Sequence, residues 1–319
     1  MQRIVQVYSY GGQTVNVLLE GKRLDDAWDV SIWEKNGHRE ISARQVVQWV
    51  DMGEVPALDK PHPIDDAEWL EERRQHSLKK AAQRAQTMCR RVIKAEGFDE
   101  LLTITYRENQ TDRELAKKHF KEWVSRMKSA LGGTFRYCAS FEKQDRGAMH
   151  MHVACHRLPK AVIRQEKRRV VGGHTMIKGA GAQFETVERE VEGWRLGTEV
   201  WRSIVGQDNG LVFVGGKKAS VSKKRVRKSP AKMAQYVSKY IMKDYADSPE
   251  ESNRYSRSNG SDVPKPQHIR LTGCSLSEAI GAMFECKDGD VVVSHRLGDF
   301  KDSYWLCTEP IWGEKKPAH

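Results

Sequence analysis

An alternation of apolar and polar residues, interrupted by one amphipathic helix, runs through residues 101–156 and constrains the fold more than any other feature. Apolar and hydroxyl residues alternate over 101–106, which is typical of a half-buried strand. A capping box follows, with Thr111 as the N-cap and Glu114 at N3, and predicts the start of a helix. Apolar residues then recur at helical spacing until the two glycines at 132–133, which predict its end.

Two further strands are predicted after this helix, with a polar turn at 144–147 between them. Residues 135–142 alternate in character, as strand residues with one buried face do. In the next strand, 149–156, apolar residues hold the odd positions, whereas His150 and His152 hold even positions and face the other side.

The pattern continues with a helix, a short strand and a last helix. A basic insertion near 158–181 precedes apolar residues at helical spacing, and 211–214 is a short, fully apolar strand. Ser229 and Pro230 then predict another helix, with serine as N-cap and proline at N1. The order strand–helix–strand–strand–helix–strand predicts an α+β fold with a ferredoxin-like core, an antiparallel sheet and helices on one face.

The regions around this core predict a division into three parts. Residues 1–65 combine short alternating segments with a helix expected near 42–50, and three prolines in 56–63 indicate a linker. This part is predicted to be a β-rich N-terminal module. Residues 66–246, which begin with a long charged helix, form the predicted core domain, and 247–319 form a C-terminal accessory region with β-type segments.

Charge and composition narrow the class of protein. The 319 residues carry 54 Lys and Arg against 43 Asp and Glu, a net charge of +11, and such a balance favours nucleic acid as partner. The longest apolar stretch is far shorter than the roughly 20 residues of a membrane-spanning helix, and no secretory signal is expected from the first residues. The six cysteines are scattered without a CxxC pair, which favours a reducing cytoplasm over a disulfide framework or a zinc site.

Two histidines and a glutamate form the first candidate site. His150 and His152 are two positions apart on a predicted strand, so both side chains project from one face. Glu142 lies on the corresponding face of the neighbouring strand. Two imidazoles and a carboxylate suit a divalent cation that binds substrate oxygens as a Lewis acid, although a His-x-His pair alone is more often ordinary surface.

The second candidate site lies on the helix that begins near residue 230. Tyr236, Lys239, Tyr240 and Lys243 fall on one stripe of this helix, one turn apart. The neighbouring stripe is apolar and can pack on the sheet: Met233, Val237 and Ile241. Both phenols and both ammonium groups are therefore expected outside the core. The alternative is a helix with two packing tyrosines and solvated lysines.

Together these residues predict phosphoryl-transfer chemistry. A phenol is a poor nucleophile at neutral pH until a cation or base assists it. A cation held by the histidines would polarise a phosphodiester, while Lys239 or Lys243 would stabilise developing charge. The product is a phosphotyrosine, which keeps the bond energy for rejoining, and a second tyrosine one turn away permits a second transfer.

These motifs resemble those of the HUH endonucleases, most closely the two-tyrosine rolling-circle replication initiators of phages and some plasmids, such as the phage gene A proteins. The resemblance covers 101–244 and depends on three segments: Leu-Thr-Ile-Thr, Met-His-Met-His and Tyr-Val-Ser-Lys-Tyr-Ile-Met-Lys. It implies Mg²⁺ or Mn²⁺ on His150, His152 and Glu142, and nicking of single-stranded or supercoiled origin DNA in the cytoplasm of a bacterial host. The implied products are a 5′-phosphotyrosine and a free 3′-OH that primes a host polymerase.

A basic run before the tyrosine helix is the predicted DNA-binding segment. Such a run is often only solvated chain, but here it is placed to follow a DNA backbone, with a marked salt dependence. Its cations are Lys217, Lys218, Lys223, Lys224, Arg225, Arg227 and Lys228. Residues 210–217 nearly match a P-loop, but the lysine is one position late. No nucleotide cofactor is therefore expected, and strand separation would come from supercoiling or a host helicase.

Two alternative functions are left open by the sequence. A two-tyrosine transposase shares the motifs, although such enzymes tend to carry an N-terminal zinc module that the cysteines here do not indicate. A non-catalytic ferredoxin-like nucleic-acid-binding protein is the other, but it gives no reason for the paired histidines and tyrosines, and the aromatic RRM signature is absent. The sequence favours a DNA-nicking replication initiator.

Overall fold

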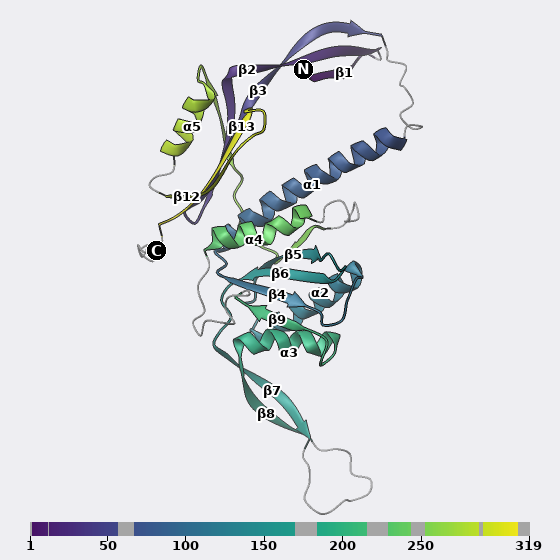
Figure 1. The fold of residues 1–319 in the computed structure, drawn as a ribbon, viewed down its shortest axis with the longest axis vertical. Helices are drawn as coiled ribbons and strands as arrows, with labels where there is room; N and C mark the ends of the chain where they lie inside the picture. Colours follow the sequence, from purple (N-terminus) through teal and green to yellow (C-terminus); the bar gives the residue numbers. More distant parts are fainter. Residues whose placement is uncertain are drawn as a thin grey trace, which may run out of the picture. The chain divides into compact units, whose positions relative to one another are not determined.

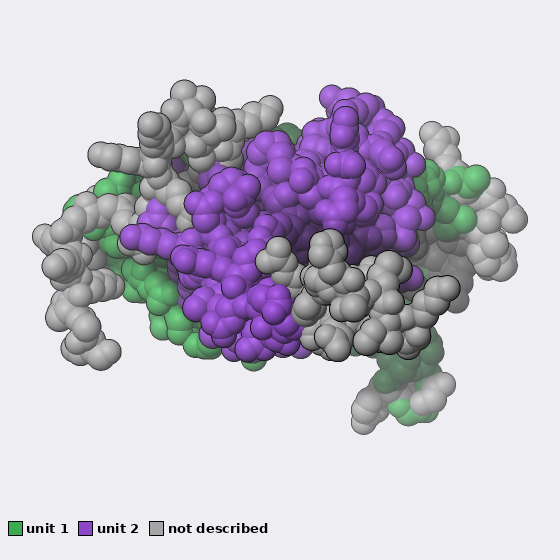
Figure 2. Space-filling model, turned by 90° about the horizontal axis from the view of Figure 1, so that it is seen from below, with its two compact units in different colours: residues 1–80, 262–319 green, residues 81–261 purple. Residues whose placement is uncertain are grey.

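The computed structural model describes residues 2–11, 13–56, 67–169, 184–215, 229–243, 253–286 and 290–311. The chain divides into two compact units, residues 1–80 with 262–319 and residues 81–261 (Figure 2). Both terminal segments of the chain therefore belong to the same unit. The three-part division with boundaries after 65 and 246 stays a prediction about domains.

The unit of residues 81–261 contains a five-stranded antiparallel sheet (Figure 1). Its strands lie in the order β10-β5-β6-β4-β9. They are β4 (Glu100–Thr105), β5 (Tyr137–Lys143), β6 (Met149–Cys155), β9 (Leu211–Val214) and β10 (Tyr255–Arg257). Helix α2 (Arg113–Ala130) connects β4 to β5, and helix α3 (Gly193–Val205) precedes β9. The fold class is thus α+β with antiparallel sheets, as predicted.

The apolar core of this unit lies between the sheet and helices α2 and α3. The odd-numbered residues of β6 belong to this core, which confirms the predicted alternation along the strand. Met151 and Val153 are fully buried in the same cluster as Phe120 and Trp123 of α2. Burial of each such side chain contributes about 1.5–3 kcal/mol, so these contacts hold α2 against β6.

The opposite face of the sheet is covered too, which the expectation of helices on one face did not include. Helix α4 (Pro230–Lys243) packs on β5 and β6. On the same face, the sulfur atoms of Cys89 in α1 (Ala67–Glu96) and Cys138 in β5 are 3.5 Å apart. Cys138, Ser140 and Ala154 are small and fully buried, so helices can approach this face closely.

The first turn of α2 begins one residue later than predicted. Asp112 is the N-cap in place of Thr111, and its carboxylate accepts hydrogen bonds from the backbone N–H groups of Glu114 and Leu115, at 2.9 and 3.0 Å. A carboxylate both satisfies these donors and interacts favourably with the helix dipole, which a threonine hydroxyl does not. The charge of Asp112 accounts for the difference.

An antiparallel hairpin is inserted between β6 and α3. Strands β7 (Ala161–Arg169) and β8 (Phe184–Glu192) form a separate two-stranded sheet. Arg189 of β8 pairs with Glu166 at 2.8 Å and with Glu199 of α3 at 2.7 Å. The predicted basic insertion near 158–181 therefore contains a strand, while 170–183 lies outside the described residues.

The other unit contains a six-stranded antiparallel sheet with one helix on it. Five strands lie in the order β1-β2-β3-β13-β12, and β11 pairs with β2. The strands are β1 (Gln2–Tyr10), β2 (Gln13–Lys35), β3 (His38–Val55), β11 (Gln267–Thr272), β12 (Val291–Leu297) and β13 (Ser303–Glu309). Ala279 and Met283 of α5 (Leu276–Glu285) share an apolar cluster with Trp28 and Ile41.

The helix expected near 42–50 is wrong, because these residues belong to β3. Ser42 pairs with Ser31 of β2 on one side and with Trp305 of β13 on the other. A central strand gains hydrogen bonds along both edges, and this tertiary pairing outweighs the local helical pattern.

No helix of the described residues is both long and apolar enough to cross a membrane. The six cysteines are all free, as their scattered spacing predicts. Cys89, Cys138 and Cys155 are buried, where a thiol behaves as a small apolar group.

Gly210 provides a test of the close packing between β9 and α3. Its φ is +151°, and an added Cβ would overlap Trp201 Nε1 and lie 2.9 Å from the Thr105 carbonyl oxygen, which accepts the Trp201 N–H. We expect Gly210→Ala to lower the free energy of unfolding by about 2–4 kcal/mol in guanidinium titrations. Gly281→Ala is the control, since its Cβ would meet nothing within 4 Å. Equal stability of the two variants would contradict this packing.

Candidate active site

His150 and His152 lie on the face of β6 that α4 covers. His152 is 3 % exposed and His150 is half-buried. In the register of β5 and β6, Glu142 is opposite His150 and Ser140 is opposite His152. Strand pairing therefore brings the three predicted metal-ligating residues together on one face.

Glu142 connects these histidines to the tyrosine helix. Its Oε2 lies 2.8 Å from His152 Nε2, and its Oε1 accepts a 3.0 Å hydrogen bond from Lys243 Nζ. Burial alone would raise the pKa of the Glu142 carboxyl, but the hydrogen bonds with His152 and Lys243 outweigh it and lower that pKa. Glu142 is thus a carboxylate at neutral pH, and because a carboxylate only accepts, His152 Nε2 carries the proton.

Both tyrosines of α4 contact the ring of His152. The Tyr240 ring stacks on the imidazole with a centroid distance of 3.9 Å and an interplanar angle of 10°. The Tyr236 ring meets the same imidazole edge-on at 5.5 Å and meets Tyr240 at 5.4 Å. Two segments separated by more than eighty positions in the chain thus form one aromatic cluster.

The two phenols differ in exposure, although both were expected outside the core. Tyr240 is 8 % exposed because it lies between α4 and His152, whereas Tyr236 is 36 % exposed. Burial, together with a hydrogen bond from Tyr236, raises the pKa of Tyr240 above its usual value. The helix stripe was therefore placed correctly relative to its neighbours, but Tyr240 is a buried residue.

Lysines of α4 surround the two phenols with positive charge. Lys239 Nζ lies 4.6 Å from the centroid of the Tyr236 ring and 4.7 Å from that of Tyr240, within the range of cation–π attraction. Lys243 is the ion-pair partner of Glu142 and lies 3.6 Å from Asp145. The predicted catalytic residues are thus all within one cluster.

Gln144 is a member of this cluster that the sequence interpretation missed. Its side-chain nitrogen lies 3.1 Å from His150 Nδ1. Its only signal in the sequence is its place in the turn that joins the two strands. Burial lowers the pKa of His150 to about 4, with the neighbouring His152 adding to the effect. His150 is therefore neutral at physiological pH, the form in which an imidazole binds metals.

The chemistry of these side chains fits a divalent cation, although the described residues contain no ready-made group of three or more metal ligands. His150 Nε2 and His152 Nδ1 are buried and have no hydrogen-bond partner. Such atoms are rare, since a buried polar atom without a partner costs about 1–3 kcal/mol. The Glu142 carboxylate is occupied by Lys243 and His152, so it would have to exchange one of these partners to bind a cation.

The seven cations of the predicted DNA-binding run, between Lys217 and Lys228, lie outside the described residues. The helix that follows them begins as predicted. Pro230 is its first residue, and the hydroxyl of Ser229 accepts a hydrogen bond from the Lys232 N–H at 3.2 Å.

Residues 99–245 match the model of a family of replication-associated proteins, the ORF2 family. This segment runs from the start of β4 past the end of α4, so it contains all the predicted catalytic and metal-ligating residues. No curated protein and no solved structure matches the chain significantly. The family match supports a replication initiator protein.

Ser140 tests how α4 is held over the histidines. Its buried hydroxyl donates a 2.7 Å hydrogen bond to the Val237 carbonyl, one residue from Tyr236. We expect Ser140→Ala to lower the free energy of unfolding by about 1 kcal/mol in guanidinium titrations. Ser125→Ala removes an exposed hydroxyl from α2 and is the control. If both variants unfold at the same denaturant concentration, the bond does not hold the helix.

Proposed function

We propose that this protein nicks origin DNA to initiate rolling-circle replication, with residues 81–261 as an HUH-type endonuclease unit. The observation that carries the proposal is the convergence of Tyr236 and Tyr240 on His152, next to a carboxylate and two lysines. A nucleophile, candidate metal ligands and cations in one cluster are the groups that attack on a phosphodiester requires. The match of residues 99–245 to a replication-associated family agrees with this function.

The arrangement of the sheet supports the same proposal. Numbered by their order in the chain, the four strands β4, β5, β6 and β9 lie side by side as 2-3-1-4, all antiparallel. This is the order of a ferredoxin-like sheet read from one edge. The histidines lie on the strand in position 3, beside the central strand β4, and α4 follows position 4 in the chain.

In the proposed reaction, a tyrosine oxygen attacks the phosphorus of a single-stranded DNA phosphodiester. The Tyr O–P bond forms as the P–O3′ bond breaks, the phenolic proton passes to solvent or a base, and the released 3′ oxygen takes up a proton. The 5′ end stays bound as a phosphotyrosine. Attack by the free 3′-OH of another end, or by way of the second tyrosine, reverses the step and rejoins the strands.

The side chains around the phenols have separate parts in this reaction. Lys239, above both rings, stabilises negative charge on the attacking oxygen and the phosphate. His150, His152 and Glu142 would hold Mg²⁺ or Mn²⁺, which supplies Lewis acidity to the phosphate oxygens when bound. Lys243 balances the charge of Glu142 and so keeps the carboxylate beside His152.

The partners follow from the same chemistry. The substrate is single-stranded or supercoiled origin DNA, and the basic run before α4 is placed in the chain to contact its backbone. A host polymerase extends the 3′-OH, and a host helicase separates the strands, since no nucleotide cofactor is proposed.

Two other functions make different products from the same residues. A two-tyrosine transposase would join the bound end to a new target, whereas an initiator rejoins it to its own strand. A non-catalytic nucleic-acid-binding protein would form no covalent product. The exposed phenol of Tyr236 beside Lys239 favours an enzyme over the second of these alternatives.

Covalent trapping tests the nucleophiles. The full-length protein is incubated with Mn²⁺ and a pool of labelled single-stranded DNA of random sequence, and adducts stable in SDS are isolated and sequenced. We expect adducts from the unaltered protein and none from Tyr236→Phe with Tyr240→Phe. Because Tyr236 is the more exposed phenol, Tyr236→Phe alone removes most of the first adduct, while Tyr240→Phe retains it.

Tyr8→Phe is the matched control, since Tyr8 is an exposed phenol of β1 in the other unit. Adduct formation by the double variant would refute the tyrosine assignment.

Metal removal tests the histidine site. We expect EDTA to abolish adduct formation and Mg²⁺ or Mn²⁺ to restore it, because the phosphate needs a Lewis acid. The variant His150→Ala with His152→Ala lacks two ligands and should stay inactive at any concentration of either ion. His156→Ala removes an exposed histidine just beyond β6 and should keep normal activity. Activity of the double variant with metal, or of the unaltered protein in EDTA, would exclude this site.

A further inference from the structure

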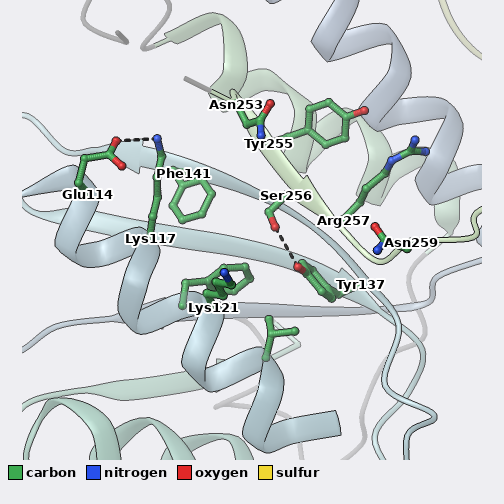
Figure 3. A pocket seen from close by; sticks show the side chains of 12 residues that line it. Glu114, Lys117, Lys121, Tyr137, Phe141, Asn253, Tyr255, Ser256, Arg257 and Asn259 are labelled. Carbon is green, nitrogen blue, oxygen red and sulfur yellow. Dashed lines mark hydrogen bonds and ion pairs between the residues drawn. The ribbon is translucent and has the colours of Figure 1, made fainter. Parts of the chain in front are cut away.

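A cavity of about 810 Å³ opens between α2 and the edge strand β10 (Figure 3). Its volume lies within the range of sites that bind small molecules, roughly 300–1,000 Å³. The residues around it come from α2, from β5 and from the segment that contains β10. All of them belong to the unit of residues 81–261.

The floor of the cavity is aromatic. Phe120 of α2 meets Tyr137 and Phe141 of β5 edge-on, with centroid distances of 5.5 and 5.4 Å. The Tyr137 hydroxyl lies 2.9 Å from Ser256 Oγ, which fixes the ring below β10 (Figure 3). Tyr255 adds a half-buried ring to the wall. A flat aromatic ligand gains stacking or edge contacts on such a surface.

The rim of the cavity is basic. Lys117 is paired with Glu114 at 2.8 Å. Lys121 and Arg257 are exposed, and neither has an ion-pair partner among the described residues. The side-chain amide of Asn259 lies on the same rim and offers both a donor and an acceptor. Two uncompensated cations over an aromatic floor favour a ligand that is both anionic and aromatic.

This cavity lies on the other side of the sheet from the tyrosine cluster. Side chains of a strand alternate between faces, and Tyr137 and Phe141 of β5 point into the core beside α2. Ser140 and Glu142 of the same strand point toward α4. A ligand in the cavity therefore does not contact the proposed nucleophiles.

We propose that this cavity binds a nucleoside phosphate, with the base against the aromatic floor and the phosphate at Lys121 and Arg257. Two sources supply this chemistry, an unpaired nucleotide of a DNA strand and a free deoxynucleotide. The first source rests on the proposed function and gives the strand a second point of attachment. The binding itself needs neither metal nor tyrosine attack.

Binding in EDTA tests the cavity without any cleavage. The probes are fluorescein-labelled oligothymidylate of 20 nucleotides, followed by anisotropy, and dTMP, followed by calorimetry. We expect Lys121→Ala with Arg257→Ala to weaken oligonucleotide binding about tenfold and to reduce the salt slope by about 1.4, since each contact with a single strand contributes about 0.7. Lys118→Ala with Lys160→Ala removes the same charge from exposed positions outside the cavity and should change affinity less than twofold.

Photocrosslinking locates the base independently of these variants. Oligothymidylate containing 5-iododeoxyuridine should crosslink the unaltered protein in the peptide that contains Tyr255. Loss of oligonucleotide binding alone assigns the site to the DNA strand, and loss of dTMP binding as well assigns it to a free nucleotide. Equal effects of the two double variants, or crosslinks only outside residues 253–259 and α2, would overturn the proposal. Such a result leaves the adduct tests unaffected, so the two proposals fail separately.

Discussion

Glu142 is a carboxylate that is 10 % exposed, and its need for partners connects the sheet to the tyrosine helix. A buried charge is tolerated only where it is paired and hydrogen-bonded. Glu142 meets this condition with His152 from the adjacent strand and Lys243 from α4. Because these two partners come from different elements, the position of α4 and the orientation of His152 depend on one another, and Tyr240 is stacked on the imidazole as a result.

The two faces of β5 separate the chemistry of this unit. Its residues alternate between a core shared with α2 and a polar face covered by α4, so one strand contributes both to the tyrosine cluster and to the floor of the cavity beside β10. This arrangement gives a DNA strand two places to bind on one small sheet. It also keeps the aromatic floor away from the nucleophiles, so the two can be altered independently.

Much of the candidate site was predictable, because it depends on two short-range periodicities. A spacing of two on a strand places His150 and His152 on one face, and a spacing of three and four on a helix does the same for Tyr236 and Tyr240. The packing between these elements was less accessible. Tyr240 was expected outside the core, and its burial arises from contact with His152, a residue far away in the chain. Gln144 was missed for the same reason, since only the folded turn brings it to His150.

The sequence by itself determined the order of strands and helices in the core, the stripes of site residues and the match to replication-associated proteins, because these depend on neighbouring residues. Only the tertiary structure decided that residues 42–50 are a strand, since their partners lie in β2 and β13, the latter some 260 positions away. It likewise decided that α4 covers the second face of the sheet. Hydrogen bonds and burial between distant segments have no local pattern, so their energies enter only when the chain is folded.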